Sequence, residues 1–166
     1  EIYGSLFSEL EPDRYPPGSK PHTVITAIGL AWEQWLERTL IAMGELVARP
    51  GELLSPEGVI YSPDLLVVNG QDRIGEIKTT CMSSKAGIEG PKFDKYHSQV
   101  KIYCYWAELT GARFYVLFLR GDYKFIMKKG ADKNDDGFPE FHVYDIDYTA
   151  RELQDNYQML VNHARH

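Results

Sequence analysis

The sequence predicts an α/β fold, in which helical segments alternate with short strands. Three segments have the apolar spacing of helices, over residues 23–48, over 93–110, and from a cap at Asp147 or Thr149 to about Ala164. Between the last two lies a continuous apolar strand at 113–120, a pattern that predicts burial on both of its faces. A chain of 166 residues, 43% of them apolar, is long enough for one domain with a full core.

The first helix is expected to run from Thr23 to about Ala48 and to end at Pro50-Gly51. Gly29, Glu33 and Glu37 follow one another at intervals of four residues, so they share a stripe along this helix. The two glutamates either belong to a solvated face or add a carboxylate to a site. The expected apolar face comprises Ile25, Ile28, Trp32, Leu36 and Leu40.

A β-hairpin is predicted next. Leu65 to Val68 is a short apolar run, and Asn69-Gly70 is a strong signal for a tight turn. Arg73 to Thr80 then has the composition of a second strand. Val59 to Tyr61, just before the hairpin, is expected to pair at the start of the sheet.

Two carboxylates and a lysine are expected to converge at this hairpin. Side chains alternate along a strand, so Glu76 and Lys78 share one face, and Asp64 opens the neighbouring strand. Such a group can bind a hard divalent cation through oxygen atoms and place an ammonium beside the cation's water or phosphate. The alternative is structural, because E-x-K on a strand is commonly a surface ion pair and Pro-Asp is commonly only a turn.

The segment after the hairpin supplies further polar candidates. Residues 81–91 form a polar loop that contains Lys85 and directly follows the carboxylates, which makes it a candidate for contact with a substrate. The helix over 93–110 places Gln99 and Tyr103 on one face, with Lys95 in the turn before them.

Charge is distributed unevenly along the chain. The net charge is −6, yet residues 73–133 contain twelve Lys and Arg against six Asp and Glu. A basic excess that begins at the carboxylates is what a phosphate-binding groove needs, although a charged run is commonly just a solvated surface.

The remaining features bear on the class of protein. Cys81 and Cys104 lack metal-ligand spacing and fit reduced thiols in a cytoplasmic protein, and no apolar run approaches a membrane span. Residues 1–22 are rich in Pro, Gly and Tyr and are expected to form an arm before a domain of residues 23–166. Asp132 to Gly137 is similar to the start of a calcium loop, but Val143 stands where the closing acid should be, so a solvated hairpin loop without calcium is expected.

The hairpin resembles the core motif of the PD-(D/E)XK nuclease superfamily, here Pro63-Asp64 followed by Glu76-Ile77-Lys78. Residues 23–120 are similar to the exonuclease branch, with the RecB nuclease domain, phage lambda-type exonucleases and CRISPR adaptation nucleases. That branch has a Gly-and-Glu helix before the core and a Q-x-x-x-Y helix after it, here Gly29 to Glu33 and Gln99 to Tyr103. The resemblance implies a single restriction-endonuclease-like domain with a central mixed sheet flanked by helices.

The function that the resemblance implies is a metal-dependent DNA exonuclease of phage or of recombination and repair. It would act in the cytoplasm of a bacterial cell or a phage-infected host and leave 5′-phosphate and 3′-hydroxyl ends. Because this sequence has only two cysteines, it is not expected to hold by itself the four-cysteine iron–sulfur cluster of some relatives. The alternatives are an endonuclease of the same fold and a non-catalytic nucleic-acid-binding module.

The resemblance also implies roles for individual residues. Asp64, Glu76 and the Ile77 carbonyl would bind one or two Mg²⁺ or Mn²⁺ ions, with Glu33 acting directly or through water. Lys78 would orient or deprotonate the attacking water and stabilise the charged transition state. Candidates for substrate contact or for bracing the site are Gln99, Tyr103, Lys85, Lys95 and Thr79.

Overall fold

The computed structural model describes residues 24–56, 58–68, 70–121 and 139–164. The chain forms two compact units, residues 1–44 and residues 45–166, and the sheet lies in the second unit. The predicted arm over residues 1–22 and the calcium-loop-like segment 132–137 lie outside the described residues.

The first unit contains the helix α2 (Val24–Ala42). The predicted extension of this helix to Ala48 is wrong, because Gly44 takes a left-handed conformation with φ 85° and ends it. Leu36 and Leu40 are buried as predicted, whereas Ile28 is exposed. Ala27 and Leu30 are buried as well, so the buried stripe differs from the predicted apolar face. Among the described helices, none combines the length and apolar character that crossing a membrane requires.

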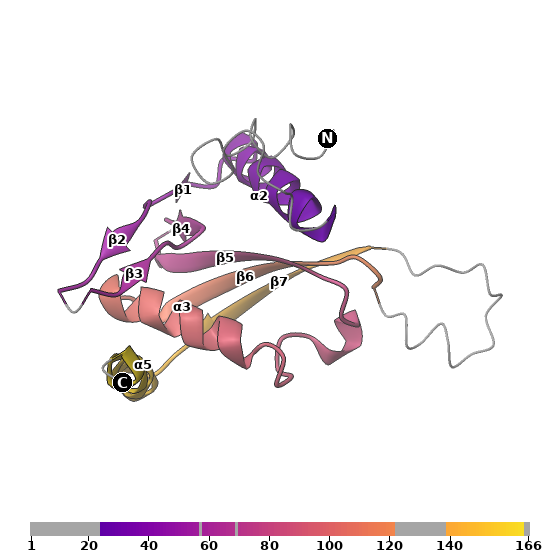
Figure 1. The fold of residues 1–166 in the computed structure, drawn as a ribbon. Coiled ribbons are helices and arrows are strands. Elements are labelled where there is room, and N and C mark those ends of the chain that lie inside the picture. Colours follow the sequence, from indigo (N-terminus) through magenta and orange to yellow (C-terminus); the bar gives the residue numbers. More distant parts are fainter. Residues whose placement is uncertain (1–23, 57, 69, 122–138, 165–166) are drawn as a thin grey trace, which may run out of the picture. The chain divides into compact units, whose positions relative to one another are not determined.

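The second unit is built on a five-stranded sheet of order β1-β4-β5-β6-β7 (Figure 1). β5 and β6 are parallel, and the other neighbouring pairs are antiparallel, so the sheet is mixed. Parallel neighbours need a crossover connection, which the helix α3 (Asp94–Trp106) provides. The strands are β1 (Val47–Ala48), β4 (Leu65–Val67), β5 (Arg73–Thr80), β6 (Gly111–Phe118) and β7 (Glu140–Asp147). The predicted α/β class with a central mixed sheet is confirmed.

The core of this unit lies between one face of the sheet and two helices, α3 and α5 (Ala150–Ala164). Both helices lie on the same side of the sheet in Figure 1. Alternate residues of β6 face this core, among them Phe114, Val116 and Phe118, and all three are fully buried. Burial at this depth is expected for the strand that the sequence marks as continuously apolar.

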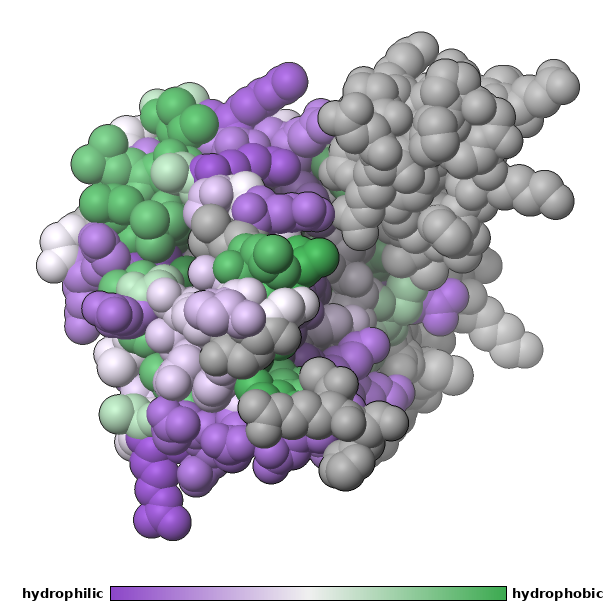
Figure 2. Space-filling view, turned by 60° about the vertical axis from the view of Figure 1, so that its left-hand side comes forward, coloured by the Kyte–Doolittle hydropathy of each residue, from purple (hydrophilic) through white to green (hydrophobic). Residues whose placement is uncertain are grey.

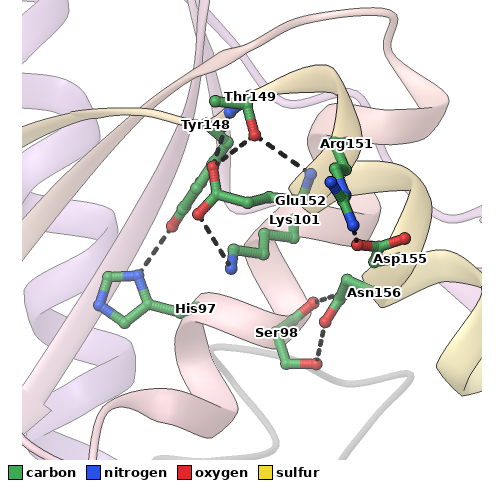
Figure 3. A network of polar contacts seen from close by, with 9 residues as sticks. All are labelled: His97, Ser98, Lys101, Tyr148, Thr149, Arg151, Glu152, Asp155 and Asn156. Carbon is green, nitrogen blue, oxygen red and sulfur yellow. Dashed lines mark hydrogen bonds and ion pairs between the residues drawn. The ribbon is translucent and has the colours of Figure 1, made fainter.

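A polar network joins α3 to α5 and to the short segment between β7 and α5 (Figure 3). The hydroxyl of Tyr148 lies 2.8 Å from Nδ1 of His97, while Nε2 of His97 donates to the Ile88 carbonyl at 2.9 Å. Ser98 and Asn156 exchange two hydrogen bonds, Oγ to Oδ1 at 2.7 Å and Nδ2 to the Ser98 carbonyl at 2.9 Å. These contacts hold α3 in place, and α3 carries Gln99 and Tyr103.

A two-stranded ribbon, β2 (Leu53–Leu54) and β3 (Ile60–Tyr61), lies beside the sheet. Its two outward residues are opposite each other, and Leu54 is 69% exposed while Ile60 is 65% exposed. Figure 2, turned to bring the ribbon's side of the molecule forward, shows hydrophobic residues interrupting the hydrophilic surface. The inward residue Tyr61 packs on α3, with its ring 6.3 Å from Tyr103 and 5.9 Å from Trp106.

Candidate active site

Asp64 is tied to the strand β5 by a hydrogen bond to its backbone. The Ile77 N–H donates to Asp64 Oδ2 at 2.8 Å, two residues beyond the last paired position, Leu65 opposite Gly75. The N–H and C=O of one strand residue point to the same edge, so the Ile77 carbonyl also faces the side of Asp64. The carbonyl of Thr80, three residues after Ile77, faces the opposite edge of β5. It accepts a hydrogen bond from the N–H of Leu119, the residue that follows β6.

Glu76 and Lys78 form an ion pair on one face of β5. Glu76 is completely buried, and the Lys78 side chain is 20% exposed. Burial alone would lower the pKa of Lys78, but the nearby charges of Glu76 and Asp64 outweigh it and raise this pKa above its ordinary value. The three residues of the predicted site therefore share one small, strongly charged volume.

The helix α3 covers this volume with Tyr103. The Tyr103 hydroxyl accepts a hydrogen bond from Gln99 Nε2 at 2.6 Å. Burial raises the pKa of Tyr103, the hydrogen bond from Gln99 lowers it, and the negative charges of Glu76 and Asp64 raise it further, so this pKa lies above its ordinary value. The predicted Q-x-x-x-Y pair is thus one hydrogen-bonded unit on α3.

The other predicted residues of the site differ in their placement. The ammonium groups of Lys78 and Lys95 lie 5.0 Å and 4.8 Å from the centroid of the Tyr96 ring. Lys85 is exposed on the short 3-10 turn η1 (Ser84–Ala86). Thr79 follows Lys78 on β5, and because side chains alternate it points to the opposite face of the sheet. Glu33 lies on α2, in the first unit, so its contribution to a metal site stays a prediction.

Two residues that position the site were not predicted from the sequence. A Cβ at Gly75 would lie 2.8 Å from the Leu65 Cβ, so only glycine allows β4, and with it Asp64, to approach β5 this closely. Tyr61 packs against Tyr103 from the ribbon. Glycine inside a strand signals a close approach of this kind, and the sequence therefore contained a clue to Gly75.

The residues present fit a hard divalent cation. In the part of the chain that the structure describes, no group of three or more His, Cys, Asp or Glu side chains is arranged to hold a metal ion. Mg²⁺, however, keeps several waters and typically needs only one or two carboxylates from the protein. Asp64, Glu76 and the Ile77 carbonyl form a donor set of hard oxygen atoms, which suits Mg²⁺ or Mn²⁺ and not a soft metal.

Comparison with models of protein families and with curated proteins finds no match for this chain. Among solved structures, the fold is similar to a phage-related exonuclease from Haemophilus somnus 129PT, with a TM-score of 0.58, 14% identity, and coverage of 95% of this chain and 76% of that one. It is also similar to an alkaline exonuclease, LHK-Exo, from Laribacter hongkongensis, with a TM-score of 0.50, 18% identity, and coverage of 98% and 77%. The structure of LHK-Exo in complex with dAMP matches with a TM-score of 0.51 and 17% identity over 96% and 75%. At these identities the likeness establishes a shared fold.

Proposed function

We propose that this chain is a metal-dependent deoxyribonuclease, an exonuclease of phage or of recombination and repair that leaves 5′-phosphate and 3′-hydroxyl ends. One observation carries the proposal: the Ile77 N–H holds Asp64 beside the Glu76–Lys78 ion pair, so two carboxylates and an ammonium meet in one place. The fold likeness to two exonucleases supports the same reading.

The chemistry follows from the charges in the site. Mg²⁺ or Mn²⁺ held by Asp64, Glu76 and the Ile77 carbonyl would supply an activated water and neutralise charge that develops on the phosphate. The Lys78 ammonium would stabilise the same developing charge from the protein side. The Gln99–Tyr103 pair would contact a phosphate oxygen or brace the site, and Glu33 would add a ligand directly or through water.

Burial of the Glu76–Lys78 pair favours a functional role over a structural one. Removing two charges from water costs free energy that their attraction often fails to repay, so a buried ion pair is weak support for stability. A second carboxylate next to the pair adds repulsion between Asp64 and Glu76. A site that binds a cation explains why this sequence places both acids there.

Incubation of the protein with linear and with circular DNA tests the proposal, in Mg²⁺, in Mn²⁺ and in EDTA. We expect degradation of linear DNA with either metal and none in EDTA. Cutting of circular DNA would indicate an endonuclease of the same fold. Binding to DNA without cutting in any metal would indicate a non-catalytic module and would refute the proposed activity.

Lys78→Met tests whether Lys78 contributes to the cleavage rate and not to metal binding. An ammonium has no lone pair with which to bind a metal ion, so we expect the cleavage rate to fall about 10²-fold or more while metal affinity changes little. Calorimetric titration with Mn²⁺ beside single-turnover cleavage measures the two effects separately. Lys101→Met is the matched control, because Lys101 pairs with Glu152 on α5, 3.8 Å away. A large loss of metal affinity with an unchanged saturated rate would contradict the assignment.

A further inference from the structure

A cleft of about 360 Å³ opens beside Lys78, and its volume lies in the range of small-molecule binding sites. We call it the Tyr96 cleft. Tyr96 joins it to the proposed site, because the Lys78 ammonium lies 5.0 Å from the centre of its ring. Thr80 also lines the cleft, on the same face of β5 as Lys78 and about 6.6 Å further along the strand. The lining residues are Thr80, Met82, Pro91, Lys92, Lys95 and Tyr96.

The chemistry of this lining suits an anion with an attached apolar group. Lys92 and Lys95 supply two exposed ammonium groups, and the lining contains no acidic residue. Met82, Pro91 and the ring of Tyr96 provide the apolar wall. The Thr80 hydroxyl accepts the Met82 N–H at 3.1 Å and can still donate its own proton. A nucleotide, with a phosphate and a flat base, has this combination of groups.

The opposite end of the site has a different character. There Tyr61 packs on Tyr103 and Trp106, and these contacts are aromatic. A nucleic-acid strand carries a negative charge at every nucleotide, and lysine side chains are what neutralise it. Lys92 and Lys95 lie on the side of the Tyr96 cleft. A DNA strand with one phosphate at Lys78 is therefore better accommodated if it continues toward this cleft than if it continues toward Tyr61.

We propose that the Tyr96 cleft binds the nucleotide next to the scissile phosphate of a DNA strand. Lys92 and Lys95 pair with its phosphate, and Tyr96 and Met82 contact its sugar or base. In the ligand-free protein the Lys95 ammonium lies 4.8 Å from the centre of the Tyr96 ring, and it leaves that ring when the phosphate binds. This inference rests on the proposed function, because it takes the scissile phosphate to lie at Lys78.

Binding can be measured without cleavage, by ¹H–¹⁵N NMR of the full chain in EDTA. The probes are thymidine 5′-monophosphate, inorganic phosphate and thymidine, which separate a nucleotide site from a simple anion site. We expect thymidine 5′-monophosphate to shift the backbone amides of Thr80, Met82, Lys92 and Tyr96, and to bind more tightly than inorganic phosphate. Shifts that are absent, or that occur only elsewhere, would overturn the proposal, as would equal affinity for both anions.

Variants assign the contacts. Lys92→Gln should lower the affinity for thymidine 5′-monophosphate about two- to fivefold, which is the effect of losing one exposed charge pair. Tyr96→Leu should weaken it about fivefold or more by removing a stacking surface, while leaving the affinity for inorganic phosphate unchanged. Arg151→Gln is the control, because Arg151 lies on α5 with its side chain 91% exposed. Thermal melts check that each variant is folded. If Tyr96→Leu is unfolded, the result for Lys92→Gln tests the proposal by itself.

Failure of this inference differs from failure of the proposed nuclease. If DNA is cleaved but Lys92→Gln and Tyr96→Leu leave both the monophosphate affinity and the KM unchanged, the cleft is not a subsite and the nuclease proposal stands. If the cleft binds the monophosphate but no metal supports cleavage, the nuclease proposal fails and the cleft is a nucleotide site of a binding protein.

Discussion

Two ion pairs on the same sheet differ in the burial of the acid and in the charges around it, while the basic side chain is similarly buried in both, with Lys78 20% exposed and Arg113 19% exposed. Arg113 of β6 and Asp145 of β7 stand opposite each other and form a two-pronged contact, Nε to Oδ1 at 2.6 Å and Nη2 to Oδ2 at 3.0 Å. Asp145 is 47% exposed. Glu76 and Lys78 are neighbours on one face of β5, Glu76 is wholly buried, and a second carboxylate, Asp64, acts on the same lysine.

The difference separates stabilising charges from charges retained for chemistry. In the exposed pair each partner satisfies the other, and the hydrogen bonds from Arg113 hold the pKa of Asp145 below its usual value. Such a pair contributes roughly 0.2–1 kcal/mol. The buried pair incurs a desolvation cost. With Asp64 beside it, the group contains two acidic side chains and only one basic side chain. We infer that the exposed pair serves the sheet and the buried pair serves a ligand.

Glu76→Gln should give the largest effect, because it keeps the shape of the buried side chain and removes its charge. We expect cleavage to fall about 10²-fold or more, as when a charged group is lost from a catalytic site. Cleavage rates on linear DNA measure the effect, and a cooperative thermal melt shows that the variant is folded. Turnover close to wild type would contradict the inference that the Glu76–Lys78 pair has a role in the reaction that the Arg113–Asp145 pair lacks.

Gly75→Ala asks whether the buried pair depends on the exact approach of β4. The new Cβ would lie 2.8 Å from the Leu65 Cβ, so the strands must separate and Asp64 must move away from the Ile77 N–H. We expect a loss of about 1–3 kcal/mol in unfolding free energy and about a ten- to hundredfold loss of rate. Gly90→Ala is the matched control, since a Cβ there meets nothing within 4 Å. Equal effects in the two variants would contradict the positioning role.

Tyr103→Phe removes the hydroxyl that accepts from Gln99 and leaves the packing of the ring. We expect a loss of about two- to tenfold in turnover or affinity, the effect of one hydrogen bond, with little change in melting temperature. Kinetics on two unrelated DNA sequences test whether preference between them is unchanged, since phosphate contacts do not read bases. Full activity in a Tyr103→Phe, Gln99→Ala double variant would show that this part of α3 is only scaffold.

Asp145→Asn should have the smallest effect and no effect on cleavage. Because the pKa of Asp145 is lowered on folding, its contribution to stability is present above the unfolded value of about 3.8 and is lost as the pH falls through the folded value. We expect the variant to be about 0.2–1 kcal/mol less stable than wild type at pH 7, with the difference shrinking below about pH 3.8. Urea melts at pH 7 and pH 3 measure this. A constant difference at both values would mean that the pair's charge is irrelevant.

Local signals predicted the elements that hold the site. The strand β5 spans Arg73–Thr80 as expected, because a tight turn and alternating side chains define it. The last helix begins after Thr149, whose hydroxyl and N–H both bond the carboxylate of Glu152. This reciprocal cap is readable from the spacing of Thr and Glu alone.

Contacts between distant segments could not be predicted in this way. The end of α2 was misplaced by six residues, since Gly44 and not Gly51 ends it, and the pairing of Val47 with Val67 decides where β1 lies. The complete burial of Glu76 depends on how α3 packs over β5, which alternation along one strand does not determine. The contact of Tyr61 with Tyr103 joins segments 42 positions apart and has no local signature.

The hydrogen bond from the Ile77 N–H to Asp64 has a consequence for which sequences can carry this geometry. The donor belongs to the main chain, so nineteen of the twenty amino acids supply it at position 77, and only proline does not. The middle letter of Glu-Ile-Lys is therefore free to change for packing without loosening the acid on the neighbouring strand. Two homologous chains could share this arrangement of charges while agreeing at very few positions around it.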